Sequence, residues 1–119
     1  MEDLFYRDHL LDHYHNPRNY GLRDDFDIEA KGSNSLCGDS IVIRLKMENA
    51  AINDICFENE GCVISRAAAS LLSEDVKGKK INEIKSAGLE DMLSLLGIKV
   101  SLSRIKCVTL ALDTIQEAI

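Results

Sequence analysis

Apolar and polar residues alternate strictly over residues 41–48, which is the pattern of a strand with one buried face. The residues on the apolar side are Ile41, Ile43, Leu45 and Met47. A second apolar run, at residues 52–58, follows the short turn Glu48-Asn49-Ala50, and residues 28–32 supply a third strand at the edge. Because so few residues separate these runs, antiparallel hairpins are expected rather than parallel crossovers.

After Gly61 the period changes from that of a strand to that of a helix. Apolar and small residues recur at helical spacing at Ile64, Ala67, Ala68, Leu71 and Leu72. The C-terminal segment repeats this spacing at Ile105, Val108, Leu112, Ile115 and Ile119. Further helices are expected at residues 4–15, 81–87 and 89–96. Strands followed by helices predict an α+β fold, with a small antiparallel sheet of about three strands and helices packed on one face.

Length and composition fit a single domain over residues 1–119. The chain has 119 residues, of which 45% are hydrophobic and 29% are charged, so it can bury one core but not two. Its net charge of −6 argues against a nucleic-acid-binding surface, which needs clustered Lys and Arg. Residues 1–10 are polar and charged, and no apolar run approaches the length of a membrane span. We therefore expect a cytoplasmic protein that binds neither nucleic acid nor membranes.

The four cysteines carry most of the chemical information in this sequence. In a reducing compartment they are not expected to form disulfides, so each is a buried small residue, a nucleophile or a metal ligand. Cys56 lies inside the second predicted strand and is expected to be structural. Cys37, Cys62 and Cys107 instead lie at the ends of predicted elements, where loops and helix N-termini can converge.

Cys107 is the candidate first acceptor of sulfur. A helix N-terminus favours a thiolate, Arg104 and Lys106 add positive charge, and Cys107 falls off the apolar stripe of its helix. Asp39, close after Cys37, would add a weaker oxygen ligand to three thiolates, which suits a site that releases its contents. No Cys-x-x-Cys pair occurs, so any metal site must be assembled from distant segments. The alternative is that all three cysteines only fill packing positions.

The histidines are a weaker signal. His9 and His13 are one helical turn apart, a spacing that can bind a metal. Two histidines without further partners rarely form a metal site, so we expect both to be solvated or to cap the helix.

Four short segments, taken together, carry a family resemblance. They are Asp12-His13-Tyr14-His15-Asn16-Pro17-Arg18-Asn19-Tyr20-Gly21, Leu36-Cys37-Gly38-Asp39, Gly61-Cys62 before a helix of small residues, and Arg104-Ile105-Lys106-Cys107. In their order and separation they resemble the U-type iron–sulfur cluster scaffold family. The resemblance implies that Cys37, Asp39, Cys62 and Cys107 cluster at one exposed end of the fold and hold a [2Fe–2S] cluster or iron. It also implies sulfur delivery by a cysteine desulfurase and transfer to client apo-proteins by a scaffold that need not be an enzyme.

The chain departs from the housekeeping branch of that family in two places. Lys106 stands where a histidine usually precedes the third cysteine. The sequence of residues 104–110 is instead similar to that of the zinc-binding sulfur-transfer branch. The separation of Cys62 and Cys107 is nevertheless too short for the insertion that this second branch usually carries. Residues 100–104 lack the Leu-Pro-Pro-Val-Lys motif that engages a dedicated Hsp70 chaperone, so we do not expect that partner.

Two other functions therefore stay open. One is a zinc-dependent sulfurtransferase in which the same four residues hold Zn and a cysteine accepts persulfide from a cysteine desulfurase. The other is a small structural zinc domain that only binds partners. Metal content distinguishes the scaffold from the sulfurtransferase in part, and sulfur acceptance distinguishes both from the structural domain.

Overall fold

The fold is described from a computed structural model, which covers residues 2–35 and 38–119. In chain order its elements are α1 (Glu2–His15), β1 (Ile28–Asn34), β2 (Asp39–Glu48), β3 (Ala51–Glu60), α2 (Val63–Val76), α3 (Ile81–Lys85), α4 (Leu89–Leu96), the 3₁₀ turn Leu102–Arg104 and α5 (Ile105–Ala118). The predicted α+β class is confirmed, because three strands and the expected helices are present. Cys37 lies outside the described residues.

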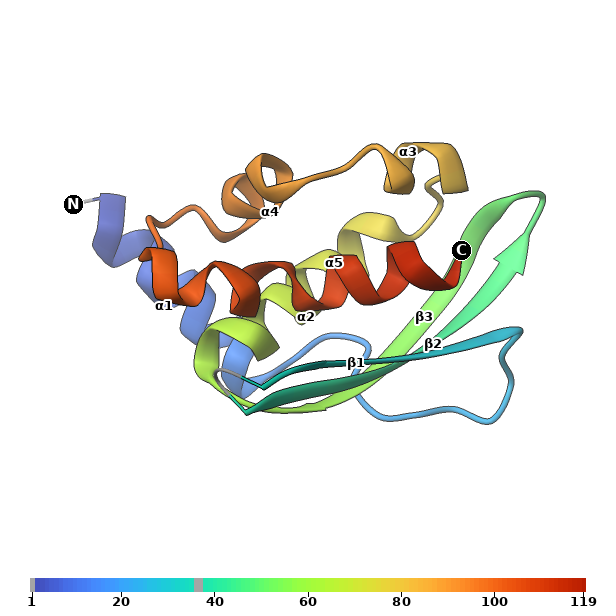
Figure 1. Cartoon of the computed structure of the whole chain (residues 1–119). Coiled ribbons are helices and arrows are strands. Elements are labelled where there is room, and N and C mark those ends of the chain that lie inside the picture. The colour runs from blue at the N-terminus through green and yellow to red at the C-terminus, as the bar shows by residue number, and fades with distance from the viewer. Residues whose placement is uncertain (1, 36–37) are drawn as a thin grey trace.

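The three strands form one antiparallel sheet with β2 in the centre (Figure 1). The alternating apolar residues of β2 are at most 3% exposed at Ile41, Ile43 and Leu45. Asn49 and Ala50 join β2 to β3 with φ values of 54° and 60°, the left-handed pair that a two-residue hairpin favours. The pairing shifts by one residue between Lys46 and Met47, and beyond that irregularity Ser40 pairs with Glu60, so the start of β2 lies beside the end of β3.

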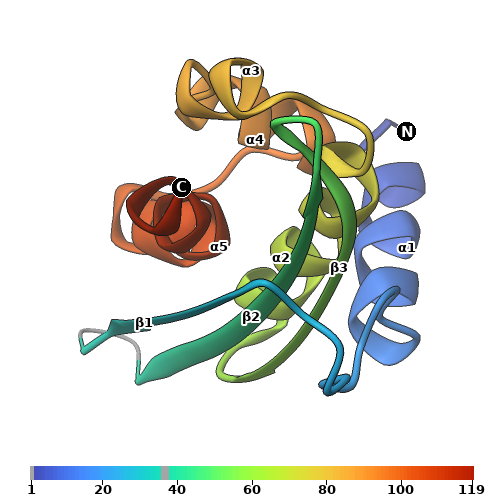
Figure 2. The same cartoon turned by 90° about the vertical axis from the view of Figure 1, so that its right-hand side faces the viewer.

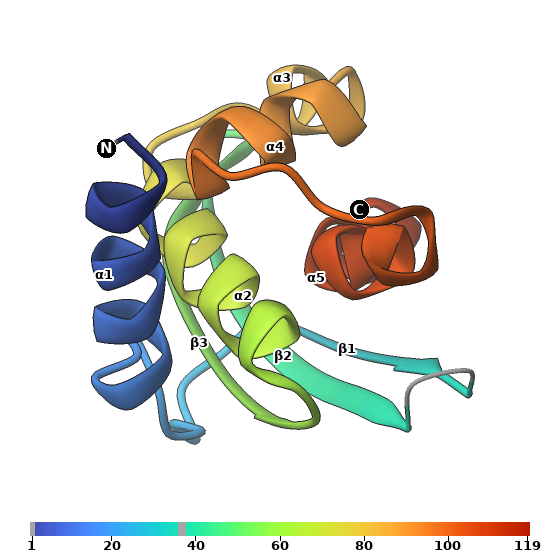
Figure 3. The ribbon, with the colours of Figure 1, turned by 90° about the vertical axis from the view of Figure 1, so that its left-hand side faces the viewer.

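The helices enclose the core against one face of the sheet, as the sequence predicts. α2 and α5 pack on the strands, and α1 packs against α2 on its other side (Figures 2 and 3). α4 contacts both α2 and α5 above them (Figure 3). The largest fully buried side chains include Phe57, Leu45, Ile52, Met92, Leu96, Val108 and Ile115. The described residues contain no helix that is both long and apolar enough to cross a membrane.

The close approach of α5 to β1 depends on Gly32. A methyl group at this position would overlap the Thr114 hydroxyl and lie 3.2 Å from Thr114 Cβ. The absence of a side chain therefore lets α5 lie directly on the edge strand. This packing brings the first turn of α5 to the end of the sheet where β2 begins and β3 ends.

Candidate metal centre

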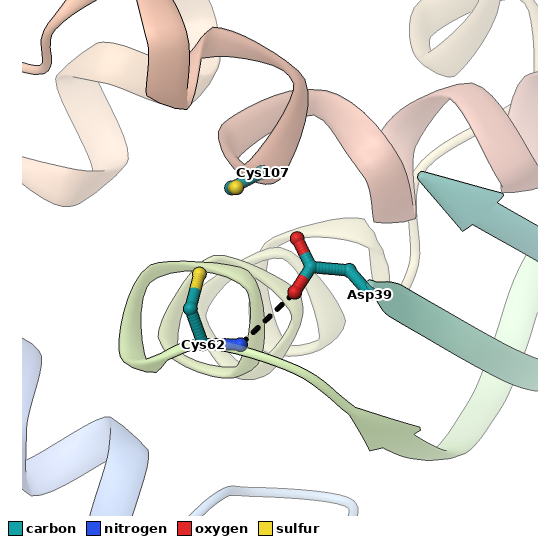
Figure 4. A group of neighbouring side chains, drawn as sticks. All are labelled: Asp39, Cys62 and Cys107. Atoms are coloured by element: carbon teal, nitrogen blue, oxygen red, sulfur yellow. Dashed lines mark hydrogen bonds between the residues drawn. The ribbon is translucent and has the colours of Figure 1, made fainter. Parts of the chain in front are cut away.

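Three side chains that can bind a metal meet where β2, α2 and α5 begin (Figure 4). Asp39 is the first residue of β2, Cys62 is the N-cap of α2, and Cys107 lies in the first turn of α5. One ligand atom from each lies within 4.8 Å of the others. Even at that limit, a point equidistant from the three atoms is about 2.8 Å from each, about 0.5 Å more than a metal–sulfur bond of about 2.3 Å, so small side-chain shifts would let one metal bind all three. The place of Cys37 in this group stays a prediction.

Asp39 is a carboxylate held almost entirely out of water. Its side chain is 2% exposed, and Oδ1 accepts a hydrogen bond from the Cys62 main-chain N–H at 3.0 Å. Its second oxygen, Oδ2, is buried and receives no hydrogen bond from any residue within 2–35 or 38–119. A buried carboxylate oxygen without a donor costs free energy, which a bound cation would remove. One carboxylate beside two sulfurs therefore fits a metal ion.

Gly61 makes the contact between Asp39 and the corner before α2 possible. Its φ of 154° is one that side chains rarely adopt. A methyl group on Gly61 would overlap Asp39 Oδ1 and lie 2.8 Å from both Asp39 Cγ and Ser65 Oγ. Both the turn and the contact with Asp39 therefore require a glycine at position 61, immediately before Cys62.

Both cysteines of the group lie at N-termini of long helices. α2 and α5 are each 14 residues long, so the positive ends of two helix dipoles point at the site. Arg104 and Lys106 are exposed beside Cys107 and add full positive charges there. These positive groups are complementary to the negative charge of the Asp39 carboxylate.

Cys107 lies in the core, although its place off the apolar stripe of α5 had suggested an exposed thiol. Cys107 is only 1% exposed, whereas Cys62 is half-buried. The Asn34 side-chain amide, at the end of β1, donates to Cys107 Sγ at 3.9 Å. This contact comes from β1, and no repeat within α5 could reveal it. Its role as the first sulfur acceptor stays a prediction.

Cys56 is separate from this group, as expected for a structural cysteine. It lies in β3 and is 3% exposed. Its register partner is Arg44, and its sulfur accepts a hydrogen bond from the Arg23 main-chain N–H at 3.3 Å. The segment that follows α1 therefore covers Cys56 on the sheet.

The prediction of a solvated or capping His13 was wrong, because this residue is 3% exposed. Its Nδ1 lies 2.7 Å from Ser70 Oγ, which also accepts a hydrogen bond from the Arg18 main-chain N–H at 2.8 Å. Burial lowers the pKa of His13, and the nearby charges of Arg18 and His9 lower it further, while Glu74 opposes them. His13 thus attaches the N-terminal segment to α2. The buried serine of α2 was the signal that sequence reasoning missed.

Comparisons with known proteins relate the chain to one family and one fold. A family model described as the NifU-like N-terminal domain matches residues 5–119. The zinc-dependent sulfurtransferase SufU of Bacillus subtilis is 34% identical over 134 residues, which cover 98% of this chain and 90% of that protein. The iron–sulfur cluster assembly scaffold protein IscU of Thermotoga maritima is 33% identical over 132 residues, which cover 98% and 93%. The crystal structure of FiSufU from Fervidobacterium islandicum AW-1 shares the fold, with a TM-score of 0.83 and 23% identity over 97% of this chain and 96% of that one.

Proposed function

The chain belongs to the NifU-like N-terminal domain family, and on that premise we propose that it is a scaffold for the assembly of a [2Fe–2S] cluster. A cysteine desulfurase supplies persulfide sulfur, an electron donor reduces that sulfur to sulfide, and iron joins it. The finished cluster passes to client apo-proteins. Its proposed ligands are Cys37, Asp39, Cys62 and Cys107.

One observation carries this proposal: a buried carboxylate oxygen without a hydrogen-bond donor in the described residues faces two sulfurs. A packing role for the two cysteines would not explain why the charged Asp39 is buried beside them. Carboxylate oxygen is a harder ligand than thiolate and binds iron–sulfur clusters less firmly. Asp39 is therefore the ligand that we expect to exchange when the cluster leaves.

A second candidate function is zinc-dependent sulfur transfer. The relationship to SufU of Bacillus subtilis supports it, and so does Lys106, which stands where the housekeeping scaffolds usually have a histidine beside the third cysteine. In this function the same residues would hold zinc, which stabilises thiolates near neutral pH. Cys107 is the candidate persulfide acceptor, but Cys62 is the more exposed of the two thiols. A donor would therefore reach Cys62 first unless β1 moves away from α5.

Anaerobic reconstitution tests both functions. The protein is incubated with a cysteine desulfurase, cysteine, ferrous iron and dithiothreitol, and then analysed by visible absorption, by iron, zinc and sulfide content, and by transfer to an apo-ferredoxin. Persulfide is measured in a parallel reaction without dithiothreitol, because that reductant cleaves persulfides. The scaffold function predicts a transferable iron–sulfur chromophore that Cys62→Ser removes and Cys56→Ser retains. Retained zinc with a desulfurase-dependent persulfide and no chromophore would overturn the scaffold in favour of the sulfurtransferase.

A further inference from the structure

A chain of hydrogen bonds joins the two arms of the corner at Gly61 and Cys62. Asn59 precedes this corner near the end of β3, and Ser65 and Arg66 follow it in the first turn of α2. The Asn59 amide donates to Ser65 Oγ at 3.4 Å, and Ser65 Oγ donates to the Cys62 carbonyl at 3.1 Å. Asn59 and Ser65 are only 5% and 4% exposed, so water competes little for these bonds.

Arg66 fixes the outer end of this chain. Its Nε donates to Asn59 Oδ1 at 3.0 Å, and a terminal nitrogen donates to the Asn59 carbonyl at 3.2 Å. The guanidinium carbon lies 5.4 Å from the ring centroids of both Tyr14 and Tyr20, within the range of cation–π contacts. Among the residues that the structure describes, no carboxylate forms an ion pair with Arg66. Its hydrogen-bonding capacity is thus directed at the corner.

The Cys62 main chain is consequently held on both sides. Its N–H donates to Asp39, and its carbonyl accepts from the Ser65 hydroxyl and from the Arg66 main-chain N–H at 3.3 Å. A change in the corner's backbone would swing the Cys62 sulfur away from the other ligands. We propose that Arg66 and Asn59 are positioning residues that set the direction of the Cys62 thiol toward the metal. This inference rests on the proposed function, because it needs a metal or cluster at the site.

Cobalt binding tests the proposal without any activity assay. Co²⁺ bound to thiolates gives a charge-transfer absorption, and competition with a chelator gives its affinity. The variants are Arg66→Leu, which keeps the aliphatic contact area, and Arg66→Lys, which keeps the charge but cannot make both bonds to Asn59. The matched control is Arg23→Leu, because Arg23 donates to the Ile55 carbonyl at 2.8 Å and to Asp54 at 2.9 Å in the same strand but away from the corner. Circular dichroism of each metal-free variant establishes that it is folded.

The expected result is that Arg66→Leu binds Co²⁺ about 10- to 100-fold more weakly than wild type, with a smaller loss for Arg66→Lys. Arg23→Leu is expected to bind Co²⁺ with wild-type affinity, even if it lowers the unfolding temperature as much as Arg66→Leu does. If Arg66→Leu does not fold, Arg66→Lys alone decides the question. Wild-type affinity in the folded Arg66 variants, or equal losses in Arg23→Leu, would overturn the positioning role while leaving the proposed function intact. A wild-type protein without the thiolate band would overturn both.

Discussion

Replacing Gly61 by alanine should damage the candidate site and the stability of the fold together. The new methyl group would overlap Asp39 Oδ1 and lie 2.8 Å from both Asp39 Cγ and Ser65 Oγ. Relief of that overlap requires Asp39 to move off the Cys62 N–H, which removes a hydrogen bond to a charged group worth about 1.5–3 kcal/mol. The φ of 154° adds backbone strain of about 1–3 kcal/mol for a residue with a side chain. The free energy of unfolding should therefore fall by about 2.5–6 kcal/mol.

Gly21→Ala is the matched control for this substitution. Gly21 also has a positive φ, 105°, but an added methyl group would meet nothing within 4 Å. It should show only the backbone strain of about 1–3 kcal/mol. Urea unfolding of the metal-free proteins, followed by circular dichroism, measures both losses, and Co²⁺ titration measures the site. If Gly61→Ala is as stable as Gly21→Ala and binds Co²⁺ with the same affinity, the overlap with Asp39 has no energetic consequence and this explanation is wrong.

Three further substitutions test other parts of the account. Asp39→Ala should slow cluster release to apo-ferredoxin or change cluster stability, because it removes the exchangeable oxygen ligand; unchanged transfer kinetics would rule out that role. Cys56→Ser should lower the free energy of unfolding by about 1 kcal/mol in urea titrations and leave metal binding intact, since Cys56 is buried outside the site. Burial holds the pKa of His13 below the usual 6.5, so its contribution to stability should be present above pH 6.5 and be lost as the pH falls through the lowered value. Urea unfolding across this range should show a steeper loss for wild type than for His13→Gln, and parallel curves would argue against it.

Local patterns were sufficient to predict the sheet. The alternation in β2 and the two-residue turn at Asn49 and Ala50 involve neighbours in sequence, so period and turn chemistry determine them. The apolar stripe of α2 likewise predicted a helix, because helical spacing places those residues on one face. The segments that carry Asp39, Cys62 and Cys107 were recognisable from their positions at element ends.

Contacts between distant segments could not be predicted in the same way. Cys107 is buried and contacts Asn34 of β1, which lies 73 positions away in the chain. The partner of His13, Ser70, lies 57 positions away, and without a visible partner in the sequence we expected a solvated or capping residue. The buried Oδ2 of Asp39 likewise became evident only from the three-dimensional arrangement. The spacing of apolar residues predicts the buried face of a single helix or strand, whereas the burial of a given residue depends on which other elements pack against it.

Mössbauer spectroscopy of protein reconstituted with enriched iron is the sharpest test of the proposed ligand set, because it distinguishes irons whose ligands differ. The proposed ligand set gives one iron two thiolates and the other iron a thiolate and the Asp39 carboxylate. Wild-type protein should therefore show two unequal ferric sites, and Asp39→Cys should make them alike. A single kind of ferric site in wild type that Asp39→Cys does not change, or no cluster iron at all, would contradict the account.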